Sequence, residues 1–156
     1  MKSPLKTLAC AAILASLAWT AQADKATEKV IKARQSFMQV YSFNIGLLGA
    51  MAKGEAEYDA KLATAAANNL VAAAQMNNGA MWPQGSGIDA YADKTSAKAE
   101  IWSSFPKVAE RHAALTEAAV KLAAEAGNGL DAVKANLGAV GKGCKGCHDD
   151  FRAPKT

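Results

Sequence analysis

Residues 130–152 read LDAVKANLGAVGKGCKGCHDDFR, and they combine a helical segment with a C-x-x-C-H motif. Ala153-Pro154 stops the segment, which favours one helix over this range. On that helix, Cys144, Cys147 and His148 stand at positions i, i+3 and i+4, so they share one face. A flat group can lie against this face while the imidazole reaches a metal at its centre.

The C-x-x-C-H sequence is typical of covalent haem attachment. Each thiol adds to one vinyl group of the porphyrin, and the histidine supplies an axial ligand. A zinc site is disfavoured, because the only cysteine outside the motif is Cys10, so the chain has no second cysteine pair. We therefore expect one covalent haem c, held by Cys144, Cys147 and His148.

The N-terminus has the three parts of a secretory signal peptide. Lys2 and Lys6 precede an apolar run over residues 8–19, and Ala21-Gln22-Ala23 offers a small-residue cleavage site. The run falls short of the roughly 20 apolar residues of a membrane span. The sequence thus predicts a cleaved signal peptide over residues 1–23, a mature domain over residues 24–156, and no membrane span.

The charge of the mature chain is modest. Removing residues 1–23 removes two lysines and no acidic residue, so the net charge falls from +4 to +2. No stripe of Lys and Arg suits a nucleic acid. We expect redox proteins or small ligands as partners, and the lysines that flank the motif, Lys142, Lys145 and Lys155, can either meet an acidic partner or only aid solubility.

The mature chain is rich in Ala, Lys, Glu and Leu and poor in β-branched residues, which favours helix throughout. We expect four helices, over residues 25–53, 58–77, 96–126 and 130–152, and a loop over residues 80–95. Pro106 should kink the third helix or split off its first turn, because an interior proline costs about 3 kcal/mol. Short connections predict an all-α, antiparallel up-down-up-down four-helix bundle with haem c bound within it.

Three glycines, Gly141, Gly143 and Gly146, cost about 1 kcal/mol each inside the fourth helix relative to Ala. Either the porphyrin approaches the backbone closely here, or the helix start is frayed.

The second axial position decides the function, because an iron with two protein ligands passes electrons, whereas an open iron binds a gas. Met38 lies on the apolar face of the first helix, one turn after Arg34, and it is either a ligand or a core residue. His112 lies in a polar stretch, which predicts a surface position. Arg152, one turn beyond His148, either approaches the imidazole or a haem propionate or ends the helix as a solvated cation.

Several features together resemble the cytochrome c′ family, the class II c-type cytochromes, whose C-x-x-C-H motif lies near the C-terminus. They are Arg34-Gln35, Ala52-Lys53-Gly54-Glu55 with Tyr58-Asp59, Glu100-Ile101-Trp102, and the run from Cys144 to Arg152. The resemblance covers nearly all of residues 28–152. It implies a four-helix bundle with one haem c, a periplasmic location and often an antiparallel homodimer.

Within this resemblance, Arg34 and Gln35 match residues that approach the haem and its propionates, and Met38 matches the distal position. High-spin members hold a non-ligating bulky residue there, whereas a Met coordinates the iron in low-spin members. The segment from Asn44 to Glu55 is more similar to the low-spin branch, which favours Met38 as a ligand.

Two functions follow. The favoured one is a periplasmic one-electron carrier with His148 and Met38 as axial ligands and other periplasmic redox proteins as partners. The alternative is a five-coordinate protein that binds NO or CO at a vacant distal site sheltered by Phe37, Met38 and Tyr41. An enzyme is not expected, because the Met38 face offers no acid–base group except Arg34.

Overall fold

The computed structural model describes residues 5–154, with side chains from residue 24 onward. The side chains of the predicted signal peptide, and Lys155, therefore lie outside the described part. The helices are α1 (Leu5–Lys53), α2 (Ala60–Gln75), the 3-10 turn η1 (Gly79–Met81), α3 (Glu100–Ser103), α4 (Phe105–Glu125) and α5 (Leu130–Phe151). No helix in the described range is both long and apolar enough to cross a membrane.

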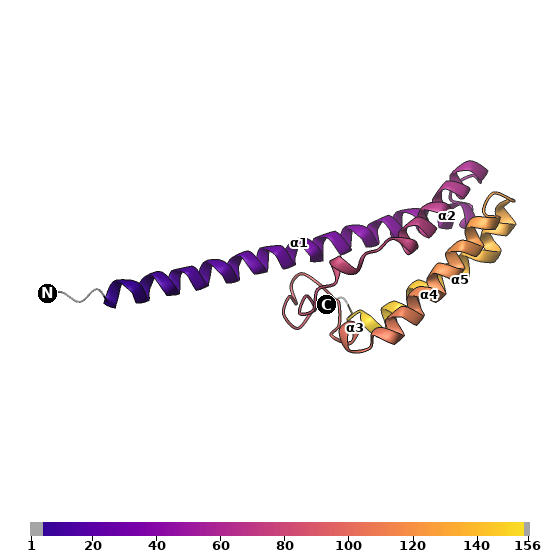
Figure 1. Ribbon diagram of the computed structural model, residues 1–156. Coiled ribbons are helices and arrows are strands. Elements are labelled where there is room, and N and C mark those ends of the chain that lie inside the picture. The colour runs from indigo at the N-terminus through magenta and orange to yellow at the C-terminus, as the bar shows by residue number, and fades with distance from the viewer. Residues whose placement is uncertain (1–4, 155–156) are drawn as a thin grey trace.

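The four long helices form the predicted bundle. Neighbouring helices pack as α1 with α2, α2 with α4, α4 with α5, and α5 with α1, which closes the ring. Figure 1 shows that the α1–α2 pair and the α4–α5 pair meet near their connecting turns and diverge toward the other end, where α5 ends. The C-x-x-C-H motif lies at this diverging end.

α2 and α5 occur almost where they were expected, and α1 ends where it was expected. α1 ends at Lys53, and Gly54 then takes a left-handed backbone with φ +78°. The Asp59 carboxylate caps α2 by accepting a backbone N–H of its first turn at 2.9 Å. α1 begins at Leu5, well before the predicted start at Lys25, because Ala and Leu continue the helical composition upstream without a break.

The predicted third helix is split in two. α3 ends at Ser103 and α4 begins at Phe105, so Pro106 lies in the first turn of α4, where its missing N–H costs nothing. Residues 96–99 are not helical as predicted. Ala97 instead forms an antiparallel bridge with Arg152 at the end of α5.

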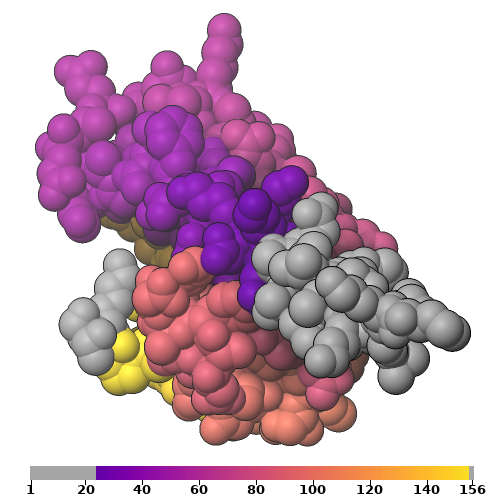
Figure 2. Space-filling model, turned by 90° about the vertical axis from the view of Figure 1, so that its left-hand side faces the viewer, coloured from indigo at the N-terminus to yellow at the C-terminus, as the bar shows by residue number. Residues whose placement is uncertain are grey.

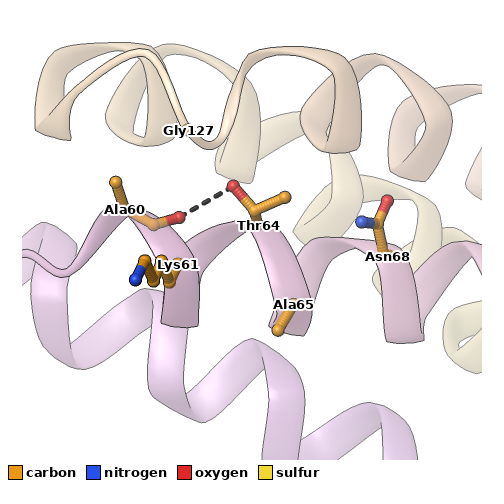
Figure 3. A pocket seen from close by; sticks show the side chains of 6 residues that line it. All are labelled: Ala60, Lys61, Thr64, Ala65, Asn68 and Gly127. Atoms are coloured by element: carbon orange, nitrogen blue, oxygen red, sulfur yellow. Dashed lines mark hydrogen bonds between the residues drawn. The ribbon is translucent and has the colours of Figure 1, made fainter.

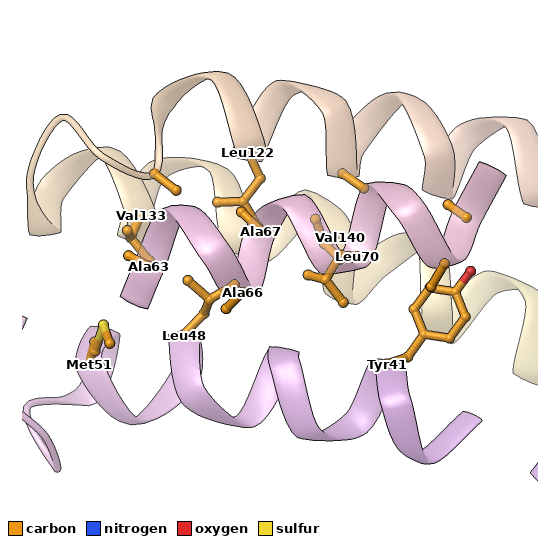
Figure 4. Packing of buried hydrophobic residues seen from close by; sticks show 14 of the residues in the cluster. Tyr41, Leu48, Met51, Ala63, Ala66, Ala67, Leu70, Leu122, Val133 and Val140 are labelled. Carbon is orange, nitrogen blue, oxygen red and sulfur yellow. The ribbon is translucent and has the colours of Figure 1, made fainter. Parts of the chain in front are cut away.

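The core is formed by positions that alternate three and four residues apart along each helix. Such a row of positions is here called the seam of its helix. These positions are Arg34, Phe37, Tyr41, Asn44, Leu48 and Met51 on α1, Ala63, Ala67, Leu70 and Ala74 on α2, Ala119, Leu122 and Ala126 on α4, and Val133, Leu137 and Val140 on α5. All of them are buried except Leu137, which is partly buried. In Figure 4, Leu48 and Leu122 point toward the alanines of α2, whose small side chains allow close helix packing.

Tyr58 fastens the two connecting turns together. Its hydroxyl donates to the carbonyl of Ala126 at 2.8 Å and accepts the N–H of Gly129 at 3.0 Å. A single side chain from the α1–α2 turn therefore satisfies two backbone groups at the α4–α5 turn.

Residues 82–99, here called the connecting segment, cover the diverging end of the bundle. In Figure 2 this segment, pink to salmon, lies below α1 and beside the yellow end of α5. It is bonded to α1 through Arg34 and Ser86, and to α5 through the Lys98 N–H and the Phe151 carbonyl at 3.0 Å. The predicted loop is thus an ordered link between the first and last helices.

Candidate haem site

The haem motif continues the seam of α5. Cys144 and Cys147 follow Val140 at spacings of four and three, so they face the bundle interior. Val140 is fully buried, Cys144 and Cys147 are partly buried, and the adjacent His148 is exposed. Both thiols are free.

Met38 is an uncovered apolar side chain on α1. It belongs to a stripe of residues seven apart, Ile31, Met38 and Ile45, which flanks the seam. Ile31 is 2% exposed and Ile45 is partly buried, but Met38 is 39% exposed. Protein atoms therefore cover the stripe on either side of Met38 and leave Met38 itself accessible.

These residues fit a haem c. Two thiols one helical turn apart and an adjacent imidazole provide covalent anchors and an axial ligand, and the two cysteines lie on the interior face where the helix pairs diverge. Phe105 at the start of α4 is 69% exposed, so an apolar group is uncovered on a second helix as well. Cys144, Cys147 and His148 would hold the group.

Burial shifts the pKa values of the motif side chains. It lowers the pKa of the His148 imidazole, and the nearby Arg152 lowers that pKa further. The neutral imidazole has the free lone pair that a metal needs. Burial also raises the pKa of both thiols, and it raises the pKa of Tyr41 to about 12, with Cys144 adding to the effect.

Arg34 is 3% exposed, and its guanidinium lies on the connecting segment. It donates to the Ser86 hydroxyl at 2.7 Å, to the Ser86 carbonyl, and to the Thr95 hydroxyl at 3.1 Å. Its guanidinium carbon lies 4.9 Å from the centre of the Trp82 ring, a cation–π contact. Gln35 donates to the Lys94 carbonyl at 2.6 Å. The predicted approach of Arg34 and Gln35 to the haem stays a prediction, and their contacts to this segment are additional.

Phe37 is buried, whereas Arg152 is exposed. Phe37 packs in the core, with its ring edge-on to Tyr41 at a centroid distance of 5.2 Å. Arg152 is exposed, and its backbone N–H donates to the His148 carbonyl at 3.0 Å. Their predicted roles at the haem stay predictions.

One of the three motif glycines, Gly143, lies at a close helix contact, whereas a Cβ atom on Gly141 would meet nothing within 4 Å. The close approach of the porphyrin to these glycines stays a prediction. A Cβ atom on Gly143 would lie 3.0 Å from Cα of Leu115, and one on Gly146 would lie 3.7 Å from the Arg111 side chain. Gly143 therefore lets α4 approach α5 closely. The helix is continuous here, so a frayed start is wrong for this segment.

Asp150 ties the end of α5 to α4, which sequence reasoning missed. Its carboxylate accepts from Lys107 and from Arg111, each at 2.9 Å, and both cations lower its pKa. Its carbonyl accepts from Lys98 at 2.8 Å. No local spacing links Asp150 to these partners, which lie 39 to 52 residues away along the chain.

A shallow pocket lies elsewhere, where the start of α2 meets the α4–α5 turn (Figure 3). It is lined by Ala60, Lys61, Thr64, Ala65, Asn68 and Gly127. The Thr64 hydroxyl bonds the Ala60 carbonyl of its own helix at 2.7 Å. The pocket is at the opposite end of the bundle from the motif and is not part of the site.

A family model described as Cytochrome C′ matches residues 29–152. The chain is 35% identical to a cytochrome c′ of Cereibacter sphaeroides, over 97% of this chain and all of that protein. It is 32% identical to a cytochrome c-554 of the same species, over 96% and 97% of the two chains. A solved cytochrome c′ from a Rhodobacter species superimposes with a TM-score of 0.77 at 36% identity, covering 83% of this chain and 98% of that one.

Other solved neighbours carry information on ligands and assembly. Variants of the Alcaligenes xylosoxidans cytochrome c′ are described with NO and with CO bound, at TM-scores of 0.71 and 0.70 and 30% identity. Another cytochrome c′, at a TM-score of 0.73 and 32% identity, is described as having a ligand-controlled dimer dissociation.

Proposed function

Because the chain belongs to the cytochrome c′ family, we propose that it is an exported one-electron carrier in which His148 and Met38 are the two axial ligands of the haem iron. The chain binds one covalently attached haem c. When bound, this group supplies an iron that cycles between the ferric and ferrous states. The proposed activity is electron transfer with periplasmic redox partners rather than catalysis.

The exposure of Met38 is the observation that carries this proposal. Ile31 and Ile45, seven residues before and after Met38, are covered, whereas the Met38 side chain is accessible. These three residues lie beside the seam of α1. Met38 would donate its sulfur, which favours the ferrous state and raises the potential. Phe37 and Tyr41, buried beside it, would exclude water from this side.

The absorption spectrum of the purified protein tests Met38 ligation. We expect low-spin spectra in both oxidation states and little reaction with CO. Met38→Leu keeps the volume but removes the sulfur, so it should give a high-spin protein that binds CO readily. Val120→Leu, at an exposed position of α4, is the matched control and should leave the spectrum unchanged. A high-spin wild-type protein would contradict Met38 ligation.

Gas binding at a vacant distal site is the second candidate. The NO-bound and CO-bound structures of the Alcaligenes protein favour it. In this case Met38 would crowd the distal side without binding the iron, and Phe37 and Tyr41 would still keep it apolar. The same spectra separate the two functions, because Met38→Leu would then change the rate of CO binding but not the spin state.

Export and dimer formation complete the proposal. Signal cleavage after Ala23 predicts a periplasmic protein that begins at Asp24, which intact mass measurement of the holoprotein checks. The outer side of α1 exposes Val40 by 45% and Phe43 by 66%, which suits an interface with a second copy of the chain. Light scattering should show a homodimer, and Phe43→Glu should shift it to monomer.

A further inference from the structure

The seam of α4 extends beyond the packed core. Its positions, spaced alternately three and four apart, are Phe105, Val108, His112, Leu115, Ala119, Leu122 and Ala126. Ala119, Leu122 and Ala126 are buried, and Leu115 is partly buried. Val108 is also only partly covered, while His112 and Phe105 are exposed.

His112 therefore faces inward although it is accessible. It lies seven residues before Ala119, and a seven-residue step on an α-helix returns to within about 20° of the same direction. Ala119 is 1% exposed, which fixes this direction as the bundle interior. The polar neighbours of His112 in sequence hide this position, because Arg111 points instead toward α5.

His112 also lies at the level of the haem motif. Leu115 is packed against Gly143, and Arg111 lies beside Gly146 and bonds Asp150. These contacts set α4 against the turn of α5 that carries both cysteines. His112 stands between the two contact points along α4.

The imidazole is uncommitted in the described part of the chain. The backbone carbonyl of His112 accepts from the Thr116 hydroxyl at 2.9 Å, but no hydrogen bond or ion pair of the ring occurs among residues 24–154. Elsewhere the seam positions of α4 are apolar. A polar ring at this place suits a contact with a group that has both an apolar face and a polar edge.

We propose that His112 is a haem-contacting residue, whose imidazole forms part of the α4 wall of the haem site. The exposure of His112 agrees with its predicted surface position, and the proposal adds a contact on the side that faces the bundle interior. This inference rests on haem binding and is independent of whether Met38 binds the iron. Val108 and Phe105, one and two turns before His112, would continue the same wall.

The proton NMR spectrum of the holoprotein tests the contact. The chain has two histidines, and His148 belongs to the haem motif, so His112 gives the one remaining pair of imidazole signals. We expect these signals to differ in position between the ferric and ferrous protein and to broaden in the ferric state. His112→Gln should remove them and so secure the assignment.

A matched control moves the imidazole by one residue. The double variant His112→Gln with Ala113→His carries the ring at an exposed position about 100° around α4. Its signals should be less sensitive to the redox state than those of His112, and its ring should react several-fold faster with diethyl pyrocarbonate. If the His112 signals are sharp and independent of the redox state, and both rings react at equal rates, His112 does not contact the haem.

Discussion

A Cβ atom on Gly143 would lie 3.0 Å from Cα of Leu115, so α4 and α5 touch backbone to backbone beside the haem motif. Real Cβ atoms rarely come this close to another backbone. The contact explains why a residue that weakens a helix occupies this position.

Gly143→Ala should destabilise the protein although alanine favours helix. The added methyl group forces α4 away from α5, and overpacking of this kind costs about 1–3 kcal/mol, more than the roughly 1 kcal/mol gained in helix propensity. Gly141→Ala is the matched control, because a Cβ there meets nothing within 4 Å. Urea unfolding should show a lower free energy for the first variant and a higher one for the second. Equal gains would mean that the helix contact is not restrictive.

Arg34→Ala should cost about 3 kcal/mol of unfolding free energy, because it removes several charged hydrogen bonds at a buried position. It should also free the connecting segment, which hydrogen exchange at residues 86–95 would detect. Gln35→Ala is the neighbouring control, since its bond to Lys94 is exposed, and it should stay within about 0.5 kcal/mol of wild type. Similar losses in both variants would refute the anchoring role of Arg34.

Tyr58→Phe should lower the free energy of unfolding by about 1–3 kcal/mol, because it leaves the Ala126 carbonyl and the Gly129 N–H without their partner. Tyr91→Phe removes a single exposed bond to Asp24 and should change stability by less than about 0.5 kcal/mol. Thermal unfolding of the two variants under identical conditions makes the comparison. An unchanged melting temperature for Tyr58→Phe would show that water replaces the hydroxyl.

Stability at alkaline pH should depend on Tyr41. Its pKa is raised from 10.0 to about 12, first by burial and then by Cys144. The neutral phenol therefore contributes stability that is fully present below pH 10 and is lost as the pH rises toward 12. Tyr41→Phe should flatten the fall in unfolding free energy across this interval. A parallel fall in both proteins would exclude Tyr41 as its source.

The helices and the binding of a haem c could be predicted because their signals are local. Gly54, Asp59 and Pro106 each act within one turn of their own position, and the C-x-x-C-H motif lies within five residues. Composition alone could not show where α1 begins, since the upstream residues favour helix equally well.

The contacts around the site could not be predicted, because they join distant residues without a repeating pattern. Arg34 and Ser86 are 52 residues apart, and Asp150 and Arg111 are 39 apart. The glycines were visible in the sequence, but only the helix packing shows that Gly143 faces α4. The exposure of His112 agrees with the surface position that its polar neighbours predict, but its place in a seven-residue repeat is informative only once Ala119 is known to be buried.

α2 has 16 residues, whereas α4 has 21 and α5 has 22. At 1.5 Å per residue, α2 is therefore about 8 Å shorter than its partners. The connecting segment lies where α2 falls short, so irregular chain outside the three-four seam covers the end of the bundle that carries the C-x-x-C-H motif. Insertions or deletions in this segment leave the register of every helix intact. The cover over the motif end can therefore be lengthened or shortened without redesigning the bundle.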